Sequence, residues 1–158
     1  MSAVTAVQAP VAVHATGVVI GEAGVVIRGA PGAGKSSLAS ALLAVAEEGA
    51  HFGALIGDDR LFLSAHHGRV IARGHPAIRG KIERRGQGIL EIGAEPGVVV
   101  RLVIDILPPE QVLRYPETIN PYVTLCGVEL PLLALPKAGS ACDSALTVLA
   151  RLRQFGAI

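Results

Sequence analysis

Apolar residues in this chain gather mostly in short runs bounded by Gly, Pro or charged residues, a pattern typical of strands. The runs predict strands at residues 11–14, 18–20, 25–27, 54–57, 61–63, 69–72, 89–92 and 98–106, and an extended region at 122–135. Residues 16–17, 21–24 and 65–68 are expected to be turns, and the last of these joins a hairpin. Residues 73–88 are expected to form a basic, Gly-containing connection, and residues 110–114 one helical turn.

Apolar residues recur at helical spacing in two segments. The first begins after a Gly-rich stretch and ends before Gly49, with apolar positions at Leu38, Leu42 and Val45. The second covers residues 142–155, where one helical stripe holds Leu146, Leu149, Leu152 and Phe155. Because strands outnumber helices, the pattern predicts an α/β protein with a mixed sheet, much antiparallel pairing and few helices.

Composition and charge narrow the class of protein. At 158 residues the chain has the length of one domain, expected over residues 11–158 after a flexible N-terminus at residues 1–10. Aromatic residues make up only 3% of the chain, so the core is expected to be aliphatic.

A net charge of +1 argues against nucleic acid as a partner, and no apolar run suits a membrane span. Cys126 and Cys142 fit neither a metal spacing nor a disulfide framework, which favours a cytoplasmic protein.

The Gly-rich stretch lies between a predicted strand and the first predicted helix. Residues 29–36 fit the P-loop pattern of Gly, four residues and Gly-Lys-Ser. In this setting backbone N–H groups bind phosphate oxygens, Lys35 neutralises the terminal phosphates and the Ser36 hydroxyl binds Mg²⁺. The alternative is a Gly-rich turn with a solvated Lys35. We expect ATP with Mg²⁺ to be bound by Gly29, Ala30, Pro31, Gly32, Ala33, Gly34, Lys35, Ser36 and Ser37.

Two adjacent carboxylates are the next candidates. Asp58 and Asp59 directly follow a predicted buried strand, where carboxylates beside a phosphate site can bind Mg²⁺ or accept a proton from a hydroxyl group. Solvated acids at a strand end are the alternative. Asp105 is a weaker candidate, because Ile106 and Leu107 continue its strand past it.

The sequence pattern alone does not decide whether the remaining polar residues have catalytic roles. Glu83 could complete a metal shell, and Arg84 or Arg85 could counter charge on a transferred phosphoryl group. A solvated basic loop explains these residues equally well. For His14, on a short strand, the pattern favours an ordinary structural role over catalysis. Arg114, in a predicted loop, is compatible with an ordinary surface charge.

Taken together, these segments resemble the catalytic domain of HPr kinase/phosphorylase, which phosphorylates a serine of the phosphocarrier protein HPr of the bacterial sugar phosphotransferase system. The resemblance runs from about His14 to Lys137. It is strongest at His14, at the P-loop, at the Asp-Asp-Arg of residues 58–60 and at residues 83–89. Residues 83–89 are similar to a family signature that consists of Glu, any residue, Arg-Gly, any residue and Gly-Ile. The resemblance implies a phosphoenolpyruvate-carboxykinase-like P-loop fold and a homo-oligomer, commonly a hexamer.

The same resemblance implies roles for single residues. Ser36 and Glu83 would bind Mg²⁺, and Asp59 would accept the proton of the acceptor serine. The other implied active-site members are His14, Lys35, Asp58, Arg85 and Arg114.

The sequence departs from the family pattern in three places. We expect that the usual N-terminal domain has no counterpart and that the C-terminal helical region is a single helix. Lys137-Ala138-Gly139 matches the loop linked to dephosphorylation, but Ser140 stands where Arg is common. We therefore expect weak or no phosphorylase activity.

The leading hypothesis is an ATP- and Mg²⁺-dependent serine kinase acting on an HPr-like phosphocarrier. One alternative is a P-loop kinase of a small metabolite. The other is a nucleotide-sensing module without catalysis. No motif in the sequence separates ATP from GTP.

Overall fold

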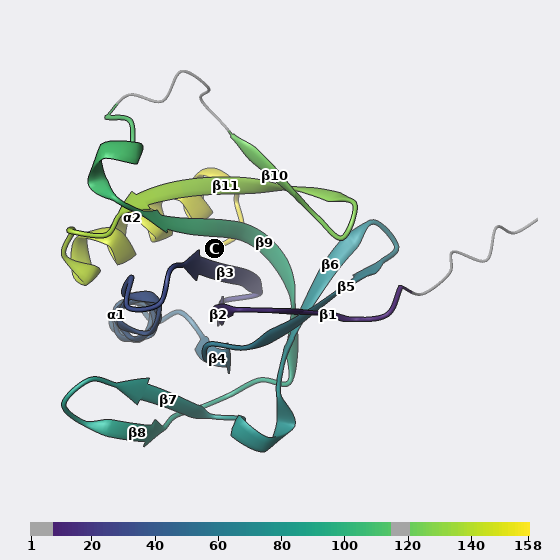
Figure 1. The fold of residues 1–158 in the computed structure, drawn as a ribbon, viewed down its shortest axis with the longest axis horizontal. Coiled ribbons are helices and arrows are strands. Elements are labelled where there is room, and N and C mark those ends of the chain that lie inside the picture. Colours follow the sequence, from purple (N-terminus) through teal and green to yellow (C-terminus); the bar gives the residue numbers. More distant parts are fainter. Residues whose placement is uncertain (1–7, 115–120) are drawn as a thin grey trace, which may run out of the picture.

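The computed structural model describes residues 8–114 and 121–158, which form a mixed sheet, two α-helices and a separate hairpin (Figure 1). Of the segment predicted to be flexible, residues 1–7 lie outside the described residues, and residues 8–10 have no regular structure. The strands of the main sheet are β1 (Val11–Val13), β2 (Ala15–Ile20), β3 (Ala23–Gly29), β4 (Gly53–Gly57), β5 (Leu61–His66), β6 (Arg69–Gly74), β9 (Gly97–Leu107), β10 (Tyr122–Leu125) and β11 (Val128–Pro136).

The long strand β9 is the centre of the main sheet. The strand order is β1-β5-β6-β9-β3-β2-β4, and β11, paired with β10, also joins the sheet at β9. Residues 97–99 of β9 pair with β6, whereas residues 103–107 pair with β11. Strands β3, β9 and β11 are parallel, so their carboxyl ends meet at one edge of the sheet. Open α/β sheets bind ligands at such an edge.

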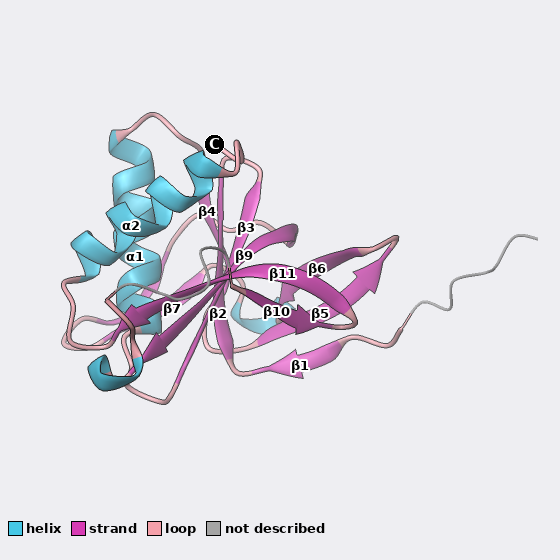
Figure 2. Ribbon diagram, turned by 90° about the horizontal axis from the view of Figure 1, so that it is seen from above, coloured by secondary structure: helices cyan, strands magenta, loops and turns pink. Residues whose placement is uncertain are grey.

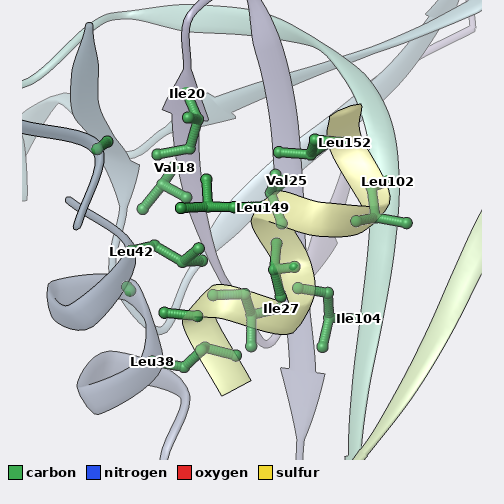
Figure 3. Close-up of a cluster of buried hydrophobic side chains, with 14 of the residues drawn as sticks. Val18, Ile20, Val25, Ile27, Leu38, Leu42, Leu102, Ile104, Leu149 and Leu152 are labelled. Carbon is green, nitrogen blue, oxygen red and sulfur yellow. The ribbon is translucent and has the colours of Figure 1, made fainter. Parts of the chain in front are cut away.

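Both helices of the described residues cover the same face of the sheet (Figure 2). Helix α1 (Lys35–Glu48) packs against α2 (Ala141–Gln154), and together they bury an aliphatic cluster on β2, β3 and β9. Figure 3 shows the residues Leu38, Leu42, Leu149 and Leu152 of the helices with Val18, Ile20, Val25, Ile27, Leu102 and Ile104 of the strands. A second cluster on the opposite face packs β5, β6 and the β10–β11 hairpin against the sheet. Within the described ranges, neither helix is long and apolar enough to cross a membrane.

Two segments predicted to lack regular structure form strands. Residues 16–17 are buried inside β2, because β2 pairs with β3 on one side and with β4 on the other. The predicted connection at 73–88 contains a 3₁₀ turn, η1 (Pro76–Ile78), and β7 (Lys81–Arg84), which pairs with β8 (Gly88–Glu91). In both cases the backbone N–H and C=O groups form hydrogen bonds with a partner strand, which the local sequence pattern does not reveal.

The buried face of α2 differs from the predicted stripe. Leu149 and Leu152 of that stripe are buried and Phe155 is partly buried against the core, but Leu146 is 56% exposed. The remaining buried positions of α2 are Ala145 and Val148. A helix turns once in 3.6 residues, so repeated steps of three drift off one face, whereas steps of three and four stay on it. The predicted stripe used only steps of three.

Smaller corrections concern three other segments. The turn predicted at 21–24 is shorter, since β3 begins at Ala23. The helical turn predicted at 110–114 is a 3₁₀ turn, η2 (Pro109–Gln111). The extended region at 122–135 is the β10–β11 hairpin, whose turn residues Cys126 and Gly127 both have positive φ. Pro131 lies within β11, opposite the first residue of β10.

Replacing Gly74, at the end of β6, by alanine is expected to destabilise the fold. A Cβ atom at this position overlaps the backbone oxygen of Ile56 in β4, and the strand ends would have to separate. We expect a loss of about 1–3 kcal/mol in the free energy of unfolding, measured by urea denaturation.

Gly93→Ala is the matched control, because a Cβ there meets nothing within 4 Å. Its free energy of unfolding should change by no more than about 0.5 kcal/mol. Equal stability of the two variants would contradict the close approach of β6 to β4.

Candidate active site

The Gly-rich loop joins β3 to α1 at the carboxyl edge of the sheet. Gly32 and Gly34 have φ of 75° and 103°, which glycine adopts without steric cost. Gly34 is the N-cap of α1, so the first backbone N–H groups of the helix remain donors for an anion. Lys35 is buried, and its Nζ donates to the backbone oxygens of Gly29 at 3.1 Å and Ala30 at 3.3 Å. The loop therefore combines helix donors with a positive charge held beside its own backbone.

Asp58 connects three parts of the site through hydrogen bonds. This buried carboxylate follows β4. Its Oδ1 accepts from Ser36 Oγ at 2.7 Å and from Thr16 Oγ1 at 2.9 Å. Its Oδ2 accepts from the backbone N–H of Glu83, with an N–O distance of 3.0 Å. One side chain thus fixes the Gly-rich loop, β2 and β7 relative to one another.

Asp59 lies in different surroundings. Its φ of 63° is left-handed, a conformation that Asp adopts more readily than most residues. Its Oδ1 lies 2.9 Å from His14 Nε2, and the side chains of His14 and Asp59 are 53% and 63% exposed. Of the two adjacent carboxylates, one is therefore enclosed by hydrogen bonds and the other is open to an incoming group.

Thr16 is a site residue that sequence reasoning missed. Its side chain is fully buried, and its hydroxyl donates to Asp58 Oδ1 and accepts from the backbone N–H of Asp59 at 3.2 Å. It therefore positions both aspartates. The sequence signal for this role is a polar residue among the apolar residues 15–20. It can be recognised only if residues 15–20 are interpreted as one continuous strand.

Thr16→Val is expected to lower the free energy of unfolding by about 1–3 kcal/mol, because the buried Asp58 Oδ1 loses one of its two donors and the backbone N–H of Asp59 loses its acceptor. The side chains are similar in size, so packing changes little. Urea denaturation measures the loss. Thr16→Ser keeps the hydroxyl group and should lose less stability than Thr16→Val, while a stable Thr16→Val would show that the hydroxyl does not hold the aspartates.

A cavity of about 450 Å³ lies against these groups. It is lined by His14, Pro31, Gly32, Gly34, Lys35, Ser36, Ser37, Asp58, Asp59, Glu83 and Arg85. We call it the acidic cavity. The structure thus brings the Gly-rich loop, the aspartate pair and the β7–β8 hairpin to one place. The other predicted loop residues are Gly29, Ala30 and Ala33, of which Ala33 is buried.

Two residues that the sequence suggested as active-site members do not line the acidic cavity as described. Arg114 is exposed beyond η2 and is not among the residues that line the acidic cavity as described. Asp105 forms a two-point ion pair with Arg28, its neighbour on β3, with N–O distances of 2.7 Å and 2.9 Å. This contact between adjacent strands supports a structural role for Asp105.

The oxygen atoms near the loop fit a Mg²⁺ ion that is bound together with phosphate. Among the described residues, no group of three or more His, Cys, Asp or Glu side chains is placed to hold a metal. Mg²⁺ commonly takes one or two protein carboxylates and completes its shell with water and substrate phosphates. Ser36, Asp58 and the exposed Glu83 all line the acidic cavity, and their hydroxyl and carboxylate oxygens are of the kind that would serve as such ligands.

The fold and the site together define an α/β protein built around a strand, a P-loop and a helix, with paired aspartates at a neighbouring strand end. The chain belongs to the family of the HPr Serine kinase C-terminal domain, whose model matches residues 6–136. The family resemblance found in the sequence is confirmed.

Two relatives illustrate the match. The chain is 36% identical over 94 residues to the HPr kinase/phosphorylase of Mycoplasma mycoides subsp. mycoides SC, and this match covers 60% of the chain but only 28% of that relative. The structure of the HPr(Ser) kinase/phosphatase from Coxiella burnetii matches with a TM-score of 0.75 at 24% identity, covering 91% of this chain and 95% of that chain. This likeness confirms the predicted fold class, an α/β fold with a mixed, mostly antiparallel sheet and few helices.

Proposed function

We propose that this chain is an ATP- and Mg²⁺-dependent kinase that phosphorylates a serine of an HPr-like phosphocarrier protein. The observation that carries the proposal is the acidic cavity, where the phosphate loop, both aspartates and Glu83 meet. Family membership supports the kinase class, and the names of the two relatives support HPr as the acceptor.

The loop side of the acidic cavity would hold the triphosphate. Backbone N–H groups at the start of α1 and the Lys35 ammonium group would bind its oxygens. Ser36 and Glu83 would hold Mg²⁺, which neutralises phosphate charge when bound. Asp58 positions Ser36 through the 2.7 Å hydrogen bond between their side chains.

The open side of the same cavity would admit the acceptor serine. Asp59, exposed and oriented by His14, would accept the proton of the serine hydroxyl as the serine oxygen attacks the terminal phosphorus. The bond from that phosphorus to the bridging oxygen breaks, and ADP leaves. Arg85, in the turn of the β7–β8 hairpin, would add positive charge beside the transferred group. Arg114 stays a predicted member of the site.

Intact-mass spectrometry of HPr after incubation with the protein, ATP and Mg²⁺ tests the function. The expected result is one added phosphoryl group on a serine, absent without ATP and absent from HPr in which that serine is alanine. Transfer to a small metabolite but not to HPr would assign the chain to a metabolite kinase. ATP binding without transfer to either would favour a nucleotide-sensing module.

Ser140 gives a physical basis for the proposed weakness of the reverse reaction. Ser140 is the N-cap residue of α2, and its hydroxyl oxygen accepts a hydrogen bond from the backbone N–H of Asp143 at 3.5 Å. A helix cap supplies no cation for phosphate. We therefore propose slow dephosphorylation of phosphoserine-HPr by inorganic phosphate, and rapid release of pyrophosphate would overturn this.

Three further sequence predictions belong to the proposal. They are one catalytic domain over residues 11–158, a cytoplasmic location and a homo-oligomer. Sedimentation velocity of the purified chain tests the last, and a monomer at all concentrations would contradict it.

A further inference from the structure

The β7–β8 hairpin carries two residues of the acidic cavity but is not part of the main sheet. In the described part of the chain its strands pair only with each other, and Figure 1 shows the hairpin beside α1, apart from the other strands. At its base, two backbone hydrogen bonds of 2.9 Å join Leu55 of β4 to Gly93 and Glu95. The hairpin is therefore attached to the sheet at its base, whereas Glu83 and Arg85 lie toward the turn at the other end.

The side chains of β7 alternate between two cavities. Glu83 and, just beyond the strand, Arg85 line the acidic cavity. Ile82 and Arg84 line a different cavity, of about 760 Å³, between the hairpin and α1, which we call the rear cavity. Successive side chains of a strand point to opposite faces, so the strand conformation itself produces this division. The hairpin is thus a wall with a cavity on each side.

Ile82 spans the space between this wall and α1. Its side chain is 1% exposed, and it alone is buried among the described residues 81–91. It belongs to the aliphatic cluster beneath the two helices, and α1 contacts β7. Arg84 and Leu90, which also line the rear cavity, are half-buried and exposed. Because the rear cavity leaves space behind the rest of the hairpin, the volume of the Ile82 side chain sets the distance between hairpin and helix.

A polar contact joins the same part of the hairpin to the acidic cavity. The backbone N–H of Glu83 donates to Asp58 Oδ2, with an N–O distance of 3.0 Å. Glu83 directly follows Ile82, so a shift of Ile82 toward α1 lengthens this hydrogen bond and moves the Glu83 carboxylate. A misplacement of about 1 Å can lower a rate by about 10²-fold, even when the substitution lies far from the reacting atoms.

We infer that Ile82 is a positioning residue, whose packing against α1 holds Glu83 and Arg85 at the acidic cavity. Ile82 is not among the residues that line the acidic cavity as described, so it acts through these two neighbours. For its effect on phosphoryl transfer the inference rests on the proposed function. Its effect on the hairpin is independent of that function and can be measured separately.

Ile82→Val tests the inference by removing one methyl group. Ile20→Val is the matched control, because Ile20 is fully buried in the same aliphatic cluster but lies on β2. Hydrogen exchange of the Glu83 backbone amide, measured by NMR, reports on its bond to Asp58. We expect this amide to exchange about three- to tenfold faster in Ile82→Val than in Ile20→Val, because only the first variant loosens the hairpin locally.

Steady-state transfer from ATP to HPr gives the second measurement. We expect kcat of Ile82→Val to fall by about three- to tenfold, while the KM for ATP stays within about twofold of wild type because the Gly-rich loop is unchanged. Ile20→Val should change neither value. Ile82→Leu conserves the side-chain volume and should keep kcat within about twofold of wild type. A general loss of stability would not separate kcat from KM in this way.

The two measurements separate failure of the inference from failure of the proposed function. A wild-type protein that transfers no phosphoryl group to HPr defeats the proposed function, and the amide comparison then still decides whether Ile82 holds the hairpin. Equal exchange of the Glu83 amide in Ile82→Val and Ile20→Val would overturn the inference alone. In an active protein, faster exchange with an unchanged kcat would also overturn it, because the position of the hairpin would then not serve transfer.

Discussion

Asp59→Asn is expected to lower the rate of phosphoryl transfer to HPr by about 10²–10⁴-fold, the usual contribution of a general base. An amide cannot accept the serine proton at neutral pH. Asparagine suits the φ of 63° at this position, and the side chain is exposed, so folding should be unaffected. Single-turnover transfer from ATP to HPr measures the rate, and calorimetry should show ATP affinity within about twofold of wild type.

Asp58→Asn provides the contrasting variant. The Asp58 carboxylate accepts hydrogen bonds from Ser36, Thr16 and the backbone of Glu83, and an amide must turn its NH₂ group toward at least one of these donors. We expect a loss of about 1–3 kcal/mol in the free energy of unfolding, as well as slower transfer. If Asp59→Asn keeps full activity, or if it loses as much stability as Asp58→Asn, the proposed division of roles between the two aspartates is wrong.

Lys35→Met is the second substitution with a large expected effect. Methionine retains an unbranched apolar side chain in this buried position but removes the charge. A hydrogen bond to a charged group contributes about 1.5–3 kcal/mol, so we expect the Kd of ATP to rise by about 10–10²-fold. Calorimetry with ATP and Mg²⁺ measures this change, and transfer to HPr should fall with it.

Lys81→Met is the matched control for that change. Lys81 is exposed on β7 and is outside the described lining of the acidic cavity, so its loss should leave ATP affinity within about twofold of wild type. Similar losses of ATP affinity in Lys35→Met and Lys81→Met would indicate a general effect of removing positive charge. Unchanged ATP binding in Lys35→Met would remove Lys35 from the phosphate site.

The conformation of the Gly-rich loop at residues 29–36 could be predicted from sequence because its signals are local. The glycines that need positive φ, the lysine and the helix that follows lie within one continuous segment, so no distant contact decides their conformation. The same holds for the β5–β6 hairpin, whose turn residues His67 and Gly68 both have positive φ.

The arrangement of the acidic cavity depends on contacts that local patterns do not contain. The local pattern predicts a turn at Thr16, because only the pairing of β2 with two other strands shows that residues 16–17 are extended and buried. The different surroundings of Asp58 and Asp59 follow from partners on β2, on α1 and in the β7–β8 hairpin. Pattern alone left Glu83 ambiguous, and only the family resemblance connected it with the loop.

The parallel pairing of β3 with β9 has a consequence for synthesis of the protein. Translation completes β3 at Gly29, but its parallel neighbour ends only at Leu107 and the strand beyond that at Pro136. Pairing across such sequence separations forms late, because long chain segments must be closed first. The emerging polypeptide therefore presents the apolar strand β3 without its parallel neighbour until Leu107 has been synthesised.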